Sequence, residues 1–319
     1  MNMKILVTGA AGFIASRVCE MLLEKGEQVV GLDNMNDYYD VRLKEYRLNK
    51  LLAYPNFTFY KADIENTSEL KPIFETNTFR SVFNLAARAG VRYSMVNPWV
   101  YLRTNTEGTL NLLELMKDFG VKKFILASTS SLYAGLPMPF NEDLRVNTPI
   151  SPYAASKQAA EAFAYTYHKQ YGIDVSVLRY FTVFGPGGRP DMAPYRFAKW
   201  ILEGTPITLY GDGTQARDFT YVDDIARGTI LAEKPLGYEI INLGGGKEPV
   251  TINQFIKWIE ELTGKKATIN YQPNHSADMQ ETMANIEKAK RVLGWEPNID
   301  TFDGLQNIVK KNKLLNYRI

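Results

Sequence analysis

The segment YAASK places Tyr153 and Lys157 four residues apart. In a helix, residues at this spacing share a face, so the lysine ammonium could lie near the phenol. A neighbouring cation favours the phenolate and lowers the pKa of a tyrosine towards neutrality, which makes the side chain a usable base. An exposed helix with an incidental Tyr/Lys pair would show the same spacing. The pair therefore indicates proton chemistry only when other residues support it.

Three hydroxyls stand in a row in the segment ASTSSLYAG, at Thr129, Ser130 and Ser131. They follow an apolar run that is typical of a buried strand. Hydroxyls at the end of a strand can share a proton with a catalytic base. They can equally cap a turn, where serine and threonine are common. The residues alone leave both roles open.

The segment TGAAGFIA, residues 8–15, predicts a dinucleotide site. Gly9 permits a sharp turn, and Gly12 would let a pyrophosphate approach a helix N-terminus, where free N–H groups favour anions. Ala15 takes the third glycine position, which tolerates alanine. Asp33, after the next apolar run, would accept hydrogen bonds from both ribose hydroxyls and repel a 2′-phosphate, so it favours NAD over NADP. A glycine-rich turn without a ligand is the alternative.

Alternating strand and helix patterns in the first half of the chain would position these residues. Runs typical of strands lie at 4–8, 28–32, 57–61, 81–85, 123–128 and 174–180. Amphipathic stretches lie between them, at 13–25, 40–52, 67–77, 98–119 and 152–171. The alternation predicts an α/β fold with a Rossmann-type, doubly wound parallel sheet, which binds ligands at the carboxyl ends of its strands.

The alternation ends near residue 181, where FGPGGRPDMAP clusters glycines and prolines. Shorter units follow, with helices near 192–203, 222–233, 251–263, 285–293 and 302–315 and strands near 207–211 and 238–245. We predict a dinucleotide-binding domain of residues 1–181 plus about 218–250. A smaller α/β lobe for the substrate would comprise about 182–217 plus 251–319.

Composition excludes several other classes of protein. The chain has 319 residues and a net charge of +2, which gives no reason to expect nucleic acid or a membrane surface as partner. No apolar run approaches the roughly 20 residues of a membrane span. Cys19 is the single cysteine, which suits a reducing cytoplasm, and with only two histidines no zinc site, and no other metal site, is expected. We expect a cytoplasmic enzyme.

The motifs TGAAGFIA, NLAARAG, YAASK and LRYFTVFGP, together with Asp33 and Thr129, resemble the extended short-chain dehydrogenase/reductases in order and spacing. The chain is similar to their nucleotide-sugar epimerases and dehydratases from about residue 3 to beyond 300. The resemblance implies that Tyr153 is the catalytic base, that Lys157 holds the nicotinamide ribose and tunes Tyr153, and that Thr129 shares the sugar proton. It also implies a tightly bound NAD that is regenerated in each cycle.

The resemblance extends to the rest of the cofactor site. Asp63 would contact adenine, although capping a helix in DIENTSEL explains it equally well. The residues expected to bind NAD are Gly9, Gly12, Phe13, Ile14, Asp33, Asn34, Asp63, Ile64, Leu85, Ala86, Ala87, Tyr153, Lys157 and Tyr180.

Two serines restrict the reactions that this family performs after oxidising C4 of the sugar. Its 4,6-dehydratases usually carry Asp-Glu directly after the catalytic threonine, and its UDP-glucuronate decarboxylases carry Glu at the second position. This chain has Ser130 and Ser131 there, and an ordinary hydroxyl does neither job well. Both reactions are therefore disfavoured. The expectation is C4 epimerisation through a transient 4-keto sugar, with the hydride returned to the opposite face.

Thr182 points to the substrate, because members that act on UDP-galactose usually have asparagine at this place in RYFT. Ser130, Ser131 and Thr182 would lie near C6 and could hold a carboxylate, unless the serines merely cap a turn. The segments 33–44, 86–94 and 188–192 also resemble members that convert UDP-glucuronate to UDP-galacturonate. Epimerisation of UDP-glucose or UDP-N-acetylglucosamine, decarboxylation of UDP-glucuronate, and a non-catalytic dinucleotide sensor are the alternatives.

The remaining substrate contacts also come from the resemblance. Arg217 would bind the UDP phosphates, whereas Arg92 and Arg189 are candidates for UDP or the carboxylate, or else surface charges. Asp278 is a further candidate, and His275 stands where relatives often have arginine. Family members usually form homodimers through a four-helix bundle, here from 98–119 and 152–171. Plausible contacts are Leu110, Leu113, Phe163 and Tyr167, unless these residues face the core.

Overall fold

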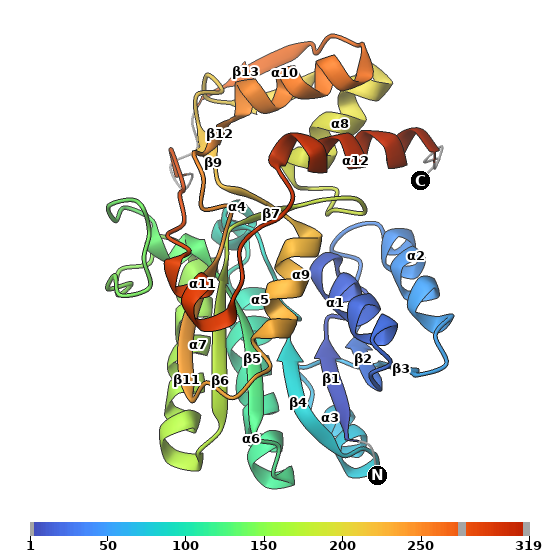
Figure 1. Ribbon diagram of the computed structural model, residues 1–319, viewed down its shortest axis with the longest axis vertical. Helices are drawn as coiled ribbons and strands as arrows, with labels where there is room; N and C mark the ends of the chain where they lie inside the picture. Colours follow the sequence, from blue (N-terminus) through green and yellow to red (C-terminus); the bar gives the residue numbers. More distant parts are fainter. Residues whose placement is uncertain (1–2, 274–278, 315–319) are drawn as a thin grey trace.

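Seven parallel strands form the centre of the computed structural model, which describes residues 3–273 and 279–314 (Figure 1). They lie in the order β11-β6-β5-β4-β1-β2-β3. The strands are β1 (Lys4–Thr8), β2 (Val29–Asp33), β3 (Phe57–Lys61), β4 (Phe79–Asn84), β5 (Lys123–Thr129), β6 (Asp174–Tyr180) and β11 (Tyr238–Leu243). The predicted doubly wound parallel sheet is confirmed. The chain order reverses between β1 and β4, which is where such sheets bind dinucleotides.

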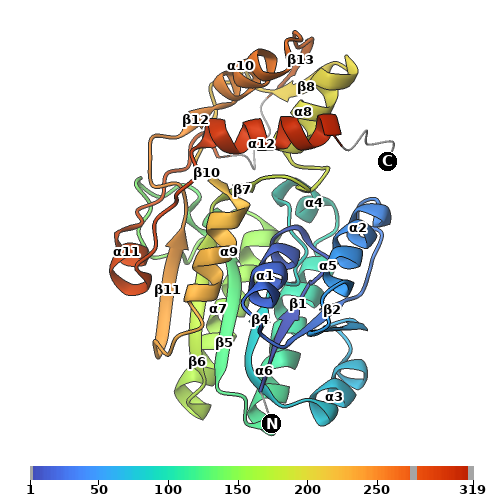
Figure 2. The ribbon, with the colours of Figure 1, turned by 45° about the vertical axis from the view of Figure 1, so that its right-hand side comes forward.

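Helices cover both faces of this sheet (Figures 1 and 2). One face carries α1 (Phe13–Glu24), α2 (Val41–Leu52), α9 (Val222–Leu231) and α11 (Glu287–Leu293). The other face carries α3 (Thr67–Thr76), α6 (Gly108–Phe119) and α7 (Pro152–Tyr171). Each set packs its apolar side against the sheet and forms a separate core. Because both faces are covered, the central strands read as continuous apolar runs.

The long helix predicted over 98–119 is interrupted. It consists of α5 (Trp99–Tyr101), a π-helical segment η1 (Leu102–Glu107) and α6, and α4 (Val91–Val96) precedes it. The wider π-helical turn buries three polar side chains, Thr104, Asn105 and Thr106. Asn105 bonds both the N–H and the carbonyl of Arg88 at 2.9 Å. Through Asn105, the π-helical segment therefore holds the backbone of Arg88, in the segment that follows β4.

A smaller lobe lies above the carboxyl ends of the strands (Figure 2). Its helices are α8 (Ala193–Glu203), α10 (Ile252–Thr263) and α12 (Thr301–Leu314), and β8 (Ile207–Tyr210) pairs in parallel with β13 (Ile269–Gln272). Two short strand pairs connect the lobes: β7 (Thr182–Phe184) with β10 (Phe219–Tyr221), and β9 (Ala216–Arg217) with β12 (Val250–Thr251). In the described part of the chain, no helix is both long and apolar enough to cross a membrane.

Candidate active site

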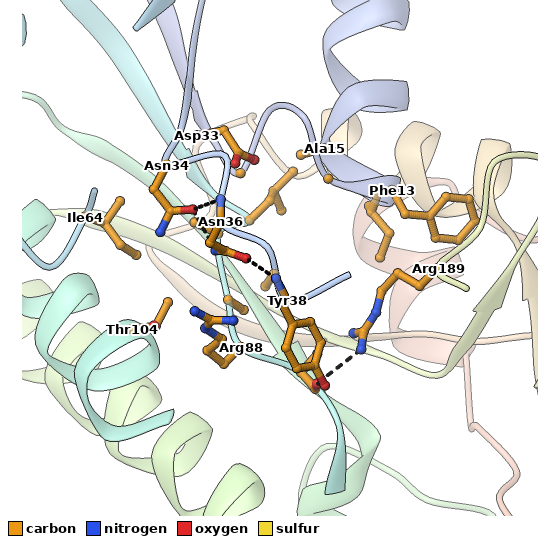
Figure 3. Close-up of a pocket in the computed structure, with 18 of the residues that line it drawn as sticks. Phe13, Ala15, Asp33, Asn34, Asn36, Tyr38, Ile64, Arg88, Thr104 and Arg189 are labelled. Atoms are coloured by element: carbon orange, nitrogen blue, oxygen red, sulfur yellow. Dashed lines mark hydrogen bonds between the residues drawn. The ribbon is translucent and has the colours of Figure 1, made fainter. Parts of the chain in front are cut away.

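A cavity opens at the carboxyl ends of β1, β2, β4 and β5, beneath the smaller lobe (Figure 3). All fourteen residues that the sequence predicts to bind NAD line this cavity. They come from the ends of five strands, β1, β2, β3, β4 and β6, and from two helices, α1 and α7. The fold thus brings together side chains that lie up to 171 residues apart in the chain, from Gly9 to Tyr180.

The turn between β1 and α1 has the conformation that its glycines predict. Gly9 has a φ of +71°, and a Cβ there would lie 2.8 Å from the Cα of Ala86 at the end of β4. Gly12 is the N-cap of α1, and no side chain caps this helix end. The first turn of α1 contains no acidic residue. Its N–H groups and dipole are therefore suited to an anionic pyrophosphate.

The carboxylate of Asp33 is held in place from three sides. It accepts hydrogen bonds from the N–H of Ala11 (3.2 Å) and of Met35 (2.8 Å), and Lys44 Nζ lies 3.3 Å away. Asp33 and Lys44 are both buried. Burial lowers the pKa of Lys44, and the charge of Asp33 opposes this shift. The cavity thus presents a fixed carboxylate at the end of β2, as a ribose-binding acid requires.

Asp63 lies in the cavity wall and does not cap a helix. The N-cap of α3 is Asn66, so the capping alternative for Asp63 is wrong. Asp63 instead accepts a hydrogen bond of 2.7 Å from Asn34, which in turn bonds Asn36 (Figure 3). These contacts order the rim between β2 and β3.

Tyr153 lines the cavity and is hydrogen-bonded to Thr129, the last residue of β5. Burial raises the pKa of Tyr153, while a hydrogen bond from Thr129 and the positive charge of Arg189 lower it. The sequence predicted that Lys157 would be the cation that lowers this pKa. In the structure Arg189 has that effect, because segment 185–191 folds back over the cavity and lines it with this side chain.

Lys157 lies on the same face of α7 as Tyr153, as the spacing predicts. Its ammonium donates a hydrogen bond of 2.8 Å to the carbonyl of Ala127. Burial lowers the pKa of Lys157 to about 8, and the charge of Glu161 opposes the shift. Glu161 is itself neutralised by Arg179, with Nη2–Oε2 at 2.7 Å. Lys157 can therefore donate to a ligand hydroxyl in the cavity.

Ser130 and Ser131 begin a short 3-10 helix, η2 (Ser130–Tyr133). The side chain that caps this turn is Thr129, whose hydroxyl oxygen accepts the N–H of Ser131 at 3.1 Å. Among the described residues, the hydroxyls of Ser130, Ser131 and Thr182 form no hydrogen bond with protein groups. The turn-capping alternative thus applies to Thr129 and not to the two serines. Thr129, Ser130, Ser131 and Thr182 are not among the residues that line the cavity, although the neighbouring Ser128 is.

The predicted arginines occupy different places. Arg189 lines the cavity, pairs with Asp191 and donates to the carbonyl of Ala89 at 3.2 Å. Arg92 lies over the ring of Tyr210, 4.0 Å from its centroid, and so connects α4 with the smaller lobe. Arg217, on β9, donates to the carbonyl of Ala216 at 2.9 Å. Asp278 and His275 lie outside the described residues.

Other residues line the same cavity and were not predicted. They are Asn36, Tyr38, Arg88 and Thr104, which Figure 3 labels, and Lys44. Lys44 had a sequence signal, since it falls on the apolar stripe of α2 beside Leu43 and Leu48. A cation in such a stripe must find a buried partner. Thr104 and Arg88 gave no comparable signal, because the π-helical turn sets their positions.

Residues 5–244 match the model of the NAD dependent epimerase/dehydratase family. The chain belongs to this family. It is 62% identical to the UDP-glucuronate 4-epimerase of Thermodesulfobacterium geofontis over 97% of this chain and 95% of that protein. The UDP-glucuronic acid 4-epimerase of Bacillus cereus, solved with UDP-glucuronic acid and NAD, has a TM-score of 0.92 at 40% identity, covering 98% of this chain and all of that one. The Thermus thermophilus UDP-glucose 4-epimerase, solved with NAD, has a TM-score of 0.89 at 31% identity, over 98% and 99%.

The family resemblance predicted from the sequence is therefore confirmed, and so is NAD as the cofactor. The cavity fits this group on its own features: an uncapped helix N-terminus for the pyrophosphate, and a fixed carboxylate at the end of β2 for a ribose.

Proposed function

We propose that the protein is an isomerase that interconverts UDP-glucuronate and UDP-galacturonate at C4 with bound NAD. The 62% identity to a UDP-glucuronate 4-epimerase over 97% of the chain carries this proposal. The three free hydroxyls at Ser130, Ser131 and Thr182 support it, because they offer donors for a carboxylate.

Tyr153 acts as the base that takes the proton of the C4 hydroxyl. Thr129 donates to Tyr153 and stabilises its phenolate, and Arg189 favours the same charge state. Lys157 would hold the nicotinamide ribose through its ammonium. NAD in this cavity would supply the acceptor for the C4 hydride and, as NADH, the donor that returns it to the opposite face of the 4-keto sugar.

The residues after Thr129 account for the choice of epimerisation. A 4-keto uronate is a β-keto acid, which loses CO2 when its C5–C6 bond aligns with the carbonyl π system. Hydroxyls that hold the carboxylate would keep this bond out of alignment, and Ser131 supplies no acid. Dehydration also lacks its acid and base, because both positions are serines.

Three arginines would bind the rest of the substrate. Arg217, on β9, would bind the UDP phosphates, and Arg92 lies over Tyr210 between α4 and the smaller lobe. Arg189 would contact the sugar or the phosphate next to it, since it lines the cavity that contains Tyr153.

The proposal also includes a cytoplasmic location and a homodimer. The dimer would form through α5–α6 and α7. Leu113 and Tyr167, two of the predicted dimer contacts, are buried in the core and cannot serve. Trp99, on the same helical segment, is instead 65% exposed, and Leu102 is 48% exposed. Such large exposed apolar groups favour a protein interface.

The test is to incubate the purified protein separately with UDP-glucuronate, UDP-glucose and UDP-N-acetylglucosamine and to follow products by NMR. We expect UDP-galacturonate from the first and much slower turnover of the others. Tyr153→Phe should abolish turnover while the variant still binds NAD. Preferred turnover of a neutral sugar, or formation of UDP-pentose as the main product, would replace the proposal with one of its alternatives. Binding of NAD with no turnover would identify a sensor.

A further inference from the structure

Arg47, on α2, connects two loops that belong to different parts of the active site. Its guanidinium donates to the carbonyl of Ala11 in the glycine-rich turn (Nη1–O, 3.1 Å). It donates twice to the carbonyl of Gly187, from Nε at 3.2 Å and from Nη2 at 2.6 Å. Nη1 also donates to the hydroxyl of Tyr39 at 2.8 Å. One side chain thus bridges the cofactor turn and segment 185–191.

Segment 185–191 depends on this outside contact for its position. It leaves β7 at Gly185, where a Cβ would lie 2.6 Å from Val222 of α9, so the segment is pressed against that helix. A bond of 3.2 Å from the N–H of Gly188 to the carbonyl of Gly185 closes a tight turn. The carbonyl of Gly187, inside this turn, accepts hydrogen bonds from Nε and Nη2 of Arg47. Arg189 follows two residues later and enters the cavity of Tyr153 (Figure 3).

Arg47 is costly to bury, and the fold gives it no counter-ion. The residue is only 5% exposed. Among the described residues it forms no ion pair, and its hydrogen-bond partners are two carbonyls and a phenol. A buried cation without a carboxylate is weakly stabilising at best. Its planar fork, however, can bond two separate oxygens in a fixed geometry, which a lysine cannot do.

We propose that Arg47 is a positioning residue, which joins the carbonyls of Ala11 and Gly187 and thereby holds Arg189 in place over Tyr153. The role rests on the proposed function, because Arg189 matters only if a UDP-sugar reacts beside Tyr153. Small displacements of a substrate-orienting group can reduce turnover by one or two orders of magnitude.

A double-mutant cycle tests the role. Arg47→Lys keeps the charge beside the cofactor turn but cannot bond both loops. We expect it to lower kcat/KM for UDP-glucuronate by roughly tenfold. In an Arg189→Ala background the same substitution should change kcat/KM by less than about twofold, because the group that Arg47 positions is gone. Arg42→Lys, on the exposed side of the same helix, is the matched control and should leave the rate unchanged.

Two further measurements separate this role from a general structural one. The dissociation constant for NAD, measured by titration of the NAD-free protein, and the melting temperature should both stay close to the wild-type values in Arg47→Lys. An equal loss of rate in both backgrounds would overturn the proposal. So would a loss of NAD affinity as large as the loss of rate, because Arg47 would then act on the cofactor turn. If the wild-type protein epimerises no UDP-sugar, the proposed function fails. That result is distinct from a failure of the role of Arg47, which is judged by comparing the variants of an active protein.

Discussion

Tyr153 depends on its neighbours for its charge state, and these neighbours come from three separate segments. Burial raises the pKa of its phenol, whereas Thr129 on β5 and Arg189 in segment 185–191 lower it. Lys157, on α7, lies in the same cavity. The ring of Tyr101 packs edge-on against Tyr153, with centroids 5.9 Å apart. Removing the hydroxyl of Thr129 or the charge of Arg189 should therefore leave a folded protein in which the pKa of Tyr153 is higher.

Arg189→Gln should move the acid limb of the pH profile of kcat/KM to higher pH. The base must be deprotonated to react, so the rate rises as pH passes the pKa of Tyr153. Loss of a nearby cation raises this pKa, and the rise in rate then comes at higher pH. Arg189→Lys, which keeps the charge, should shift the limb less. A limb that moves to lower pH, or stays fixed, would show that Arg189 does not act on Tyr153.

Ser130→Ala and Thr182→Ala should increase the formation of UDP-pentose relative to UDP-galacturonate. Each removes one hydrogen bond to the proposed carboxylate, and such a charge-assisted bond contributes about 1.5–3 kcal/mol, so the ratio should rise by at least roughly tenfold. NMR of the products gives the ratio directly. Thr166→Ala, which removes an exposed hydroxyl of α7, serves as control. An unchanged ratio in both variants would refute the carboxylate role.

The residues predicted to bind the cofactor could be recognised in the sequence because most of them lie within short motifs that follow a strand. Gly9, Asp33 and Asp63 each stand directly after such a run, and all three line the cavity. Lys44 and Arg47 were missed, because each acts across the fold on residues of other segments. Arg47 reaches a carbonyl 140 positions away. No local pattern encodes a contact of that kind.

Among the elements, α7 carries both Tyr153 and Lys157, so the definition of its first turn matters. Ser151 is its N-cap and accepts the N–H of Ala154 at 3.2 Å, and Pro152 occupies the first helical position. These two residues fix where the helix begins. Tyr153 therefore lies in a first helical turn that is capped locally, by Ser151.

Ser151→Ala should lower the free energy of unfolding by about 1 kcal/mol, the usual contribution of an N-cap. Chemical denaturation with a fitted midpoint and slope gives the value. Ser151→Asp retains an acceptor for the N–H of Ala154 and should restore most of the stability. Equal stability of the alanine variant and the wild type would show that water replaces the Ser151 hydroxyl as acceptor for the N–H of Ala154.

Long elements were predictable, and short ones were not. The strands at 4–8, 57–61 and 174–180 and the helix at 152–171 have the predicted bounds, because burial on the sheet gives them clear apolar patterns. The pairs β7–β10 and β9–β12 have two or three residues per strand, too few for a pattern. The π-helical turn at 102–107 was also missed, because the apolar spacing on both sides of it is that of an ordinary helix.

At the scale of the whole molecule, the cavity lies between a large sheet domain and a smaller lobe, and the proposed dimer surface lies on the helices behind it. Trp99 and Leu102 are exposed on that surface. On the same segment, Thr104 lines the cavity, and Asn105 bonds the backbone of Arg88, which also lines it. The proposed interface and the active site therefore share one helical segment.

Leu102→Glu should convert the proposed dimer to a monomer, because two introduced carboxylates would face each other across an apolar interface. Light scattering after gel filtration should then give the mass of a single chain, 36.2 kDa. Leu52→Glu, at an equally exposed leucine of α2, is the control and should not change the mass. A wild-type protein that is already monomeric would refute the proposed dimer.

Thr129 has one further consequence, for how this protein could change its product. Its oxygen holds the N–H of Ser131, so the backbone of the turn does not depend on the side chains at positions 130 and 131. Its proton points the other way, towards Tyr153. In the proposed mechanism, Thr129 and Tyr153 serve the oxidation of the sugar. The side chains at positions 130 and 131 serve a different purpose, because they govern what happens to the oxidised sugar. Substitutions at positions 130 and 131 should therefore leave the backbone of the turn unchanged. Single substitutions at these positions could thus give new products, in evolution or in the laboratory.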